Sequence, residues 1–202
     1  SVWHFSDLPV EIVQIIESDL SASFDDAMGD SRLIGDALNK DKRNSQNAWV
    51  PSQHWVGGFL WHYIMRANRE NFLYDLRCID GESIQYTRYG EGQFYGWHNV
   101  AGLANQYKPV TVGNRVEGLG QDFLNESIEM VRKLSFVVQL SDPDDYEGGN
   151  LQLLDEMGKS YIAPRKRGTV ILFDSRTQHR VQKVRSGVRK SLVGWTVGPR
   201  WK

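Results

Sequence analysis

Several features that mark large classes of protein are scarce or missing in this sequence. There is one cysteine, Cys78, in 202 residues, which excludes an internal disulfide framework and a metal site made of several thiolates. No apolar run approaches the ~18 residues of a membrane span, and the N-terminus lacks the basic-then-apolar pattern of a signal peptide. These absences predict a cytoplasmic protein with no membrane partner.

A net charge of one sign is also missing. Lys and Arg together number 24, and Asp and Glu number 25, so the overall charge indicates neither a nucleic-acid nor a membrane partner. The charge is uneven along the chain, because from Arg165 onward there are eleven basic residues and one acid, Asp174. Such a basic segment meets phosphates, an anionic small molecule or only solvent. The last two are favoured here over nucleic acid.

Two segments of the first 80 residues have the periodicity of helices. In residues 10–20 an apolar stripe follows Pro9, which suits the first turn of a helix. A second stripe, rich in aromatic residues, runs from about 53 to 71. The stretch 25–48 between them is polar and is interpreted as a loop. We therefore predict that residues 1–80 form an N-terminal helical support region.

From Glu82 onward the pattern changes to short β-type runs separated by glycine and aspartate. Regularly spaced short strands with such turns indicate a β-sandwich or barrel rather than βαβ units. Residues 101–129 form a long polar insertion with four glycines, which is typical of a functional loop such as a lid, or else of a disordered segment; we predict a lid. The chain is thus predicted to be one mainly β (α+β) domain with its core in residues 81–202. The predicted strands are Ser83–Tyr89, Gln93–His98, Leu134–Leu140, Asn150–Leu154, Ser160–Ala163, Thr169–Phe173, His179–Val184 and Ser191–Val197.

Two of the five histidines lie in distinctive surroundings. His98 ends an aromatic, glycine-rich strand, and His179 opens a strand that is followed ten residues later by Arg189. Two histidines from separate strands plus one carboxylate form the facial triad of non-heme Fe(II) oxygenases, which leaves open positions for a 2-oxo acid and O₂. The far carboxylate of that acid needs a buried cation, and the planar fork of arginine suits this role.

At these residues the sequence resembles the 2-oxoglutarate- and Fe(II)-dependent dioxygenases, specifically their prolyl 4-hydroxylase-like (PKHD-type) branch. The resemblance covers about residues 9–195. It implies a double-stranded β-helix (jelly roll) core with N-terminal supporting helices. It also implies Fe(2+), 2-oxoglutarate and L-ascorbate as cofactors, and a prolyl (or other) residue of a peptide or protein as the substrate. Five segments carry it, in the family's order and spacing: Tyr89–His98, Leu134–Leu140, Tyr146–Leu151, Gly168–Phe173 and His179–Trp195.

The resemblance assigns roles to six side chains of this sequence. It implies that His98 and His179 bind the iron, and that Arg189, assisted by Ser191, binds the distal carboxylate of 2-oxoglutarate. It also implies that Tyr89 forms a hydrogen bond with the co-substrate and that Trp195 closes the co-substrate pocket. Core packing explains the tyrosine and the tryptophan equally well, and the serine is equally well an ordinary strand residue. Lys190 is the alternative cation, but it is expected to face the other side of its strand.

One position departs from the family pattern, which is His-x-Asp with the carboxylate two residues after the first histidine. Here the run is His98-Asn99-Val100. Valine has no donor atom, and Asn99 is expected to point to the opposite face because adjacent strand residues alternate.

Three interpretations of Val100 stay open. The chain is a hydroxylase impaired by loss of the carboxylate, or a halogenase-like site in which water or halide completes a two-histidine iron, or a non-catalytic descendant that binds 2-oxoglutarate or a partner. Because valine is bulky, the second interpretation is disfavoured. A nucleic-acid-modifying member of the same fold is a further alternative, suggested by the basic C-terminal segment.

Overall fold

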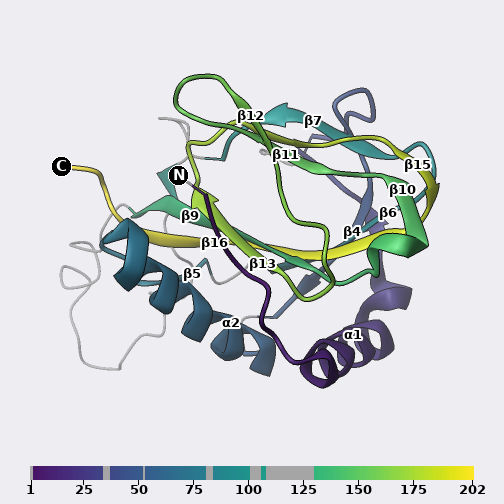
Figure 1. The fold of residues 1–202 in the computed structure, drawn as a ribbon, viewed down its shortest axis with the longest axis horizontal. Helices are drawn as coiled ribbons and strands as arrows, with labels where there is room; N and C mark the ends of the chain where they lie inside the picture. Colours follow the sequence, from purple (N-terminus) through teal and green to yellow (C-terminus); the bar gives the residue numbers. More distant parts are fainter. Residues whose placement is uncertain (1, 34–36, 52, 81–83, 101–105, 108–129) are drawn as a thin grey trace.

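A computed structural model describes residues 2–33, 37–51, 53–80, 84–100, 106–107 and 130–202 of the chain (Figure 1). Its centre is a pair of antiparallel sheets, as the jelly-roll prediction requires. The larger sheet has the order β1-β13-β9-β16-β6-β4-β2, with β5 added beside β16 and β8 beside β9. Its strands are β1 (Val2–Phe5), β2 (Gly29–Asp30), β4 (Gln46–Val50), β5 (Cys78–Ile79), β6 (Ile84–Tyr89), β8 (Gln106–Tyr107), β9 (Met130–Gln139), β13 (Val170–Asp174) and β16 (Arg189–Pro199).

The smaller sheet lies across from the larger one and has the order β12-β11-β14-β7-β3. A separate two-stranded ribbon joins β10 to β15. The strands of the smaller sheet are β3 (Arg43–Asn44), β7 (Phe94–His98), β11 (Leu151–Leu154), β12 (Ser160–Ile162) and β14 (His179–Val181), and the ribbon is β10 (Tyr146–Gly148) with β15 (Val184–Gly187). The mainly β, double-stranded β-helix (jelly roll) prediction is confirmed.

Two helices, α1 (Val10–Phe24) and α2 (Trp55–Ala67), support the larger sheet from outside (Figure 1). A short 3₁₀ turn follows α1 at Asp25–Ala27, and a π-helical turn follows α2 at Asn68–Phe72. A further 3₁₀ turn, Pro143–Asp145, precedes β10.

Strand alternation divides the interior into two parts. On one face of the larger sheet, residues such as Phe136 and Leu192 pack against the helices in the main core. On the other face, residues such as Val137 and Phe173 join Leu153 of the smaller sheet in a second cluster. Because neighbours along a strand point to opposite faces, β9 and β16 serve both parts, and the second face is left to build a site between the sheets.

The structure differs from the sequence predictions mainly in the first 80 residues. The loop prediction for residues 25–48 is wrong, because β2, β3 and most of β4 lie there. The predicted helical support region therefore also supplies strands to both sheets. The predicted strand from His179 to Val184 is divided into β14 and β15. The lid predicted for residues 101–129 lies outside the described residues, apart from 106–107, and stays a prediction.

Candidate metal and co-substrate site

A cavity of about 520 Å³ lies between the two sheets, which is within the usual size of small-molecule sites. β6, β9 and β16 of the larger sheet form one wall, and β7, β11 and β14 of the smaller sheet form the other. One arm of the cavity reaches β2 and β4. The predicted site residues that line it are Tyr89, His98, Val100, His179, Arg189 and Trp195. Ser191 is fully buried in the wall formed by β16.

His98 and His179 meet because β7 and β14 pair in a register that sets them opposite each other. Their ring centroids are 4.1 Å apart. Each Nδ1 lies beside a backbone oxygen two residues earlier in its own strand or turn, Gly96 O at 2.7 Å and Thr177 O at 2.9 Å. A carbonyl accepts only, so Nδ1 is the protonated nitrogen of each ring and Nε2 keeps its lone pair.

Burial also holds both rings in the neutral form. It lowers the pKa of His98 to about 2, with the neighbouring His179 adding to the effect, and lowers the pKa of His179 to about 4. Neutral imidazoles with a fixed tautomer and a free Nε2 are the form that binds a metal ion.

Val100 lies two residues after His98, where the resemblance predicts a carboxylate ligand. Its amide N–H donates to the Ser175 backbone oxygen at 3.1 Å, and its side chain is buried although it lines the cavity. Among the residues that the structure describes, no group of three or more His, Cys, Asp or Glu side chains could hold a metal ion. The two imidazoles therefore fit a divalent metal, while the third position of a facial triad has no ligand from the described residues.

A stack of side chains supports the first histidine. The Tyr95 ring lies flat on His98, with centroids 3.5 Å apart and planes 14° from parallel. The Arg43 guanidinium also lies over the Tyr95 ring, 4.5 Å from its centroid. Pairing of β3 with β7 sets Arg43 opposite Tyr95. Sequence analysis missed both residues. Tyr95 lies within the quoted motif next to His98, whereas Arg43 lies in the segment that was interpreted as a loop.

Arg189 forms a second polar corner, at the start of β16. It is 1% exposed, and its Nη2 donates to Gln139 Oε1 at 3.0 Å, while its guanidinium faces the Tyr89 ring at 5.6 Å. Three buried polar atoms of β6 and β16 have no hydrogen-bond partner: Arg189 Nε, Ser191 Oγ and Thr87 Oγ1. Ser191 lies two residues after Arg189 on β16 and is paired with Thr87 of β6. Each buried group left without a partner costs about 1–3 kcal/mol. A ligand carboxylate would satisfy them, so this corner fits a 2-oxo diacid.

Trp195 closes another part of the wall. Arg132 lies over its ring at 4.1 Å, and Arg132 Nη2 is 3.1 Å from the carboxylate of Asp80, whose side chain is fully buried. This ion pair fixes the guanidinium against the indole, and so holds the tryptophan in the cavity wall. Neither charged residue carries a sequence signal that marks it before the fold is known.

The sequence of the chain is similar to that of known iron- and 2-oxoglutarate-dependent enzymes. The profile of the 2OG-Fe(II) oxygenase superfamily matches residues 84–197, more than half of the chain. A PKHD-type hydroxylase of Parvibaculum lavamentivorans is 42% identical over 112 residues, which is 55% of this chain and 40% of that protein. One of Rippkaea orientalis is 33% identical over 167 residues, which is 82% of this chain and 61% of that protein. The chain thus spans about half the length of these curated relatives.

Solved structures resemble the chain over nearly all of its length. A prolyl-4-hydroxylase of Pseudomonas putida superposes with a TM-score of 0.69 at 17% identity, covering 99% of this chain and 93% of that one. A prolyl hydroxylase of Trichoplax adhaerens, solved with a peptide fragment of the hypoxia inducible factor oxygen degradation domain, gives 0.70 at 15% identity, covering 96% and 82%. At these identities the likeness is one of fold.

Proposed function

This chain belongs to the 2OG-Fe(II) oxygenase superfamily, and we propose that it is a 2-oxoglutarate- and Fe(2+)-dependent dioxygenase of the prolyl 4-hydroxylase type whose turnover is impaired at Val100. The substrate in this proposal is a prolyl, or other, residue of a peptide or protein. One observation carries it: a single cavity joins two neutral imidazoles with free Nε2 atoms to a buried arginine whose corner lacks an anion. L-ascorbate as reductant and a cytoplasmic location belong to the same proposal.

Each residue of the cavity would have a defined task. The Nε2 atoms of His98 and His179 would hold the metal, and Arg189 with the nearby hydroxyls would hold the distal carboxylate of 2-oxoglutarate. When bound, the metal and 2-oxoglutarate would supply the oxidising chemistry, with O₂ as the oxidant: one oxygen atom would enter the substrate C–H as a hydroxyl, and the other would enter the succinate formed as 2-oxoglutarate loses CO₂. Tyr89 would hydrogen-bond the co-substrate, and the buried Trp195 would keep bulk water from that part of the cavity.

The impairment follows from the chemistry of the metal site. Loss of a second-sphere partner of a metal ligand typically costs about 10–100-fold in affinity. Loss of a direct, charged ligand costs at least as much, so Val100 is expected to weaken iron binding by about 100-fold or more. Because its backbone N–H is held by the Ser175 backbone oxygen, a carboxylate introduced at this position would start from the same backbone geometry.

The test is an anaerobic titration of Fe(II) into protein saturated with 2-oxoglutarate, with the visible charge-transfer band of the chelated acid as readout. The band is expected in Val100→Asp and not in the wild type. Val100→Asn, which has nearly the same shape but no charge, is the matched control and should stay without a band. Admitting air to Val100→Asp should then release succinate. If neither protein develops the band, the assignment of the two histidines is wrong.

Val100 itself favours one second candidate, a non-catalytic protein that binds 2-oxoglutarate. Under this alternative the wild type binds the acid through Arg189, and even Val100→Asp releases no succinate.

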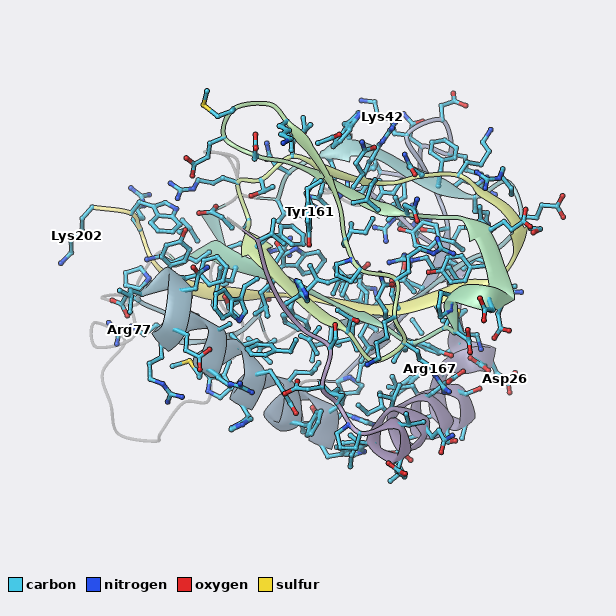
Figure 2. The ribbon with its side chains drawn as sticks, viewed as in Figure 1. Asp26, Lys42, Arg77, Tyr161, Arg167 and Lys202 are labelled. Carbon is cyan, nitrogen blue, oxygen red and sulfur yellow. The ribbon has the colours of Figure 1, made fainter. Side chains whose placement is uncertain are left out.

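The nucleic-acid alternative loses support from the way the fold uses its basic C-terminal segment. Arg165 donates to the backbone oxygens of residues 143, 146 and 148. Arg167 lies beside α1, where it pairs with Glu17 (Figure 2), and Arg176 pairs with Asp174 at 2.7 Å. These three of the segment's eleven basic residues are engaged by groups of the fold, which makes them less available to phosphates.

The described helices contain none that is both long and apolar enough to cross a membrane.

A further inference from the structure

The cavity contains a second buried guanidinium, that of Arg43, which is 6% exposed and lines the arm near β2 and β4. Three of its N–H groups donate to Ser45 Oγ at 3.2 Å, to the Arg32 backbone oxygen at 3.1 Å and to Gln85 Oε1 at 2.9 Å. All three acceptors are neutral. Within the described part of the chain, the ion pairs include none to Arg43. Its positive charge is therefore solvated by dipoles and has no counter-charge.

This corner repeats the design of the Arg189 corner. In both, a buried guanidinium donates through Nη2 to a glutamine oxygen, Gln85 Oε1 in one and Gln139 Oε1 in the other. In both, the guanidinium lies over a tyrosine ring that lines the cavity. A buried charge without a partner costs several kcal/mol, and a bound anion removes that cost. The Arg189 corner is assigned above to the co-substrate, so the Arg43 corner is left for another ligand.

The two corners are marked by different residues of β6. Gln85 and Tyr89 lie on the same face of this strand four residues apart, and at about 3.3 Å per residue their backbones are about 13 Å apart. The Arg43 corner is close to the metal position, because its guanidinium lies over Tyr95, whose ring stacks on His98.

The charges of the cavity agree with an anionic substrate. Among the described residues that line it, two are buried arginines, Arg43 and Arg189, and the carboxylate is Asp30; Arg132 also lines it. Asp30 is paired with Lys40 at 3.2 Å, and Arg132 is paired with Asp80. A divalent metal and the 2-oxoglutarate dianion would cancel each other, so the loaded cavity keeps its positive charge, which attracts an anion.

We propose that Arg43 binds a carboxylate of the substrate, so that the substrate class is an acid carrying this group near the oxidised C–H. The proposal rests on the proposed function, which gives the Arg189 corner to 2-oxoglutarate and takes this cavity as the place where the substrate lies. The carboxylate belongs either to a free small acid or to the C-terminus or an acidic side chain of a peptide. The chemistry at Arg43 is the same in each case.

The test compares ligands that differ only in the carboxylate, N-acetyl-L-proline and its primary amide, by isothermal titration in the presence of 2-oxoglutarate. A charge-assisted, two-point hydrogen bond predicts that the acid binds about tenfold or more tightly than the amide. This preference should fall to about twofold or less in Arg43→Gln and be reduced in Arg43→Lys, which keeps the charge but loses the planar fork. It should persist in Arg185→Gln, a matched loss of charge at an exposed residue.

Two further arms separate the sources of the carboxylate and the two proposals. Binding is also measured for three versions of a proline-containing pentapeptide: one with a free C-terminus, one with an amidated C-terminus, and one that carries an aspartate at that end. These peptides show whether a C-terminal or side-chain carboxylate of a peptide can take the place of the small acid. In Arg189→Gln, measured without 2-oxoglutarate, the preference for the acid should persist, because it depends on Arg43 alone. That result stands even if Val100→Asp never releases succinate, which would refute only the proposed function.

Four results would overturn the inference. The first is equal binding of N-acetyl-L-proline and its amide to the wild type. The second is no binding of N-acetyl-L-proline to the wild type up to about 20 mM. The third is a preference for the acid that survives in Arg43→Gln. The fourth is a preference that disappears in Arg189→Gln instead. If Arg43→Gln does not fold, as judged by thermal unfolding, the wild-type comparison and Arg43→Lys still decide.

Discussion

Replacing Arg189 by methionine tests whether this buried cation is present for a ligand or for the fold. In the protein without ligand, the guanidinium has one hydrogen-bond partner, Gln139, and an unpartnered Nε. Removing an uncompensated buried charge stabilises by about 1–4 kcal/mol, while leaving the Gln139 oxygen without a donor costs about 1–3 kcal/mol. The free energy of unfolding of Arg189→Met is therefore expected to lie between about 2 kcal/mol below and about 3 kcal/mol above that of the wild type.

The assay is urea unfolding with and without 2-oxoglutarate. At 100 times its dissociation constant, the ligand should stabilise the wild type by about 2.7 kcal/mol and Arg189→Met not at all. Arg185→Met is the control, because Arg185 is exposed. A loss of more than about 3 kcal/mol in ligand-free Arg189→Met would show that the protein already compensates this charge. An undiminished gain with 2-oxoglutarate would show that the acid binds elsewhere.

Three further predictions concern the sheet, the histidine stack and the pH dependence. Gly194→Ala should destabilise by about 1–3 kcal/mol in urea unfolding, because its Cβ would lie 2.3 Å from Phe136 Cζ; a neutral effect would show that the ring moves freely. In the Val100→Asp background, Tyr95→Leu should weaken Zn²⁺ binding by about 10-fold or more, whereas Tyr95→Phe, which keeps the ring stacked on His98, should not weaken it. Equal losses of Zn²⁺ affinity in the two variants would contradict a positioning role for the Tyr95 ring. Burial raises the pKa of Tyr74 from 10.0 to about 12, so its contribution to stability is complete below pH 10 and is lost as the pH rises towards 12; Tyr74→Phe should lose less stability over this range, and an identical loss would refute the assignment.

The parts of the site that could be predicted are those in which local pattern and family motif coincide. His98 and His179 each end or begin a recognisable strand, and Arg189 follows at a spacing that the next strand sets. Their meeting is a property of the strand register, which pairs His98 with His179 across the smaller sheet. No local pattern contains that register, because the two strands are separated by about 80 residues of chain.

The parts that were missed depend on tertiary contacts of polar residues. Arg43 lies in a polar stretch, and polar stretches without periodicity indicate loops. In the fold it is buried because Ser45 and Gln85 satisfy its donors, and Gln85 comes from a strand 42 residues away. Burial of a polar side chain depends on partners that the fold supplies. The same holds for Arg132, whose partner Asp80 lies 52 residues before it.

The effects of Val100 on stability and on metal binding can be measured separately, by comparing the unfolding of the wild type and of Val100→Asp with and without metal. The valine side chain is 3% exposed, so it packs without a counter-charge in the absence of a metal. An aspartate there would bury a carboxylate beside two neutral imidazoles, which disfavours the charged form and costs about 1–3 kcal/mol without metal. Val100→Asp is therefore expected to be less stable than the wild type in urea unfolding without metal. An excess of Zn²⁺ should more than restore its stability, and should stabilise the wild type less. If Zn²⁺ stabilises both proteins equally, the third ligand comes from elsewhere in the chain or from solvent, and the impairment attributed to Val100 is wrong.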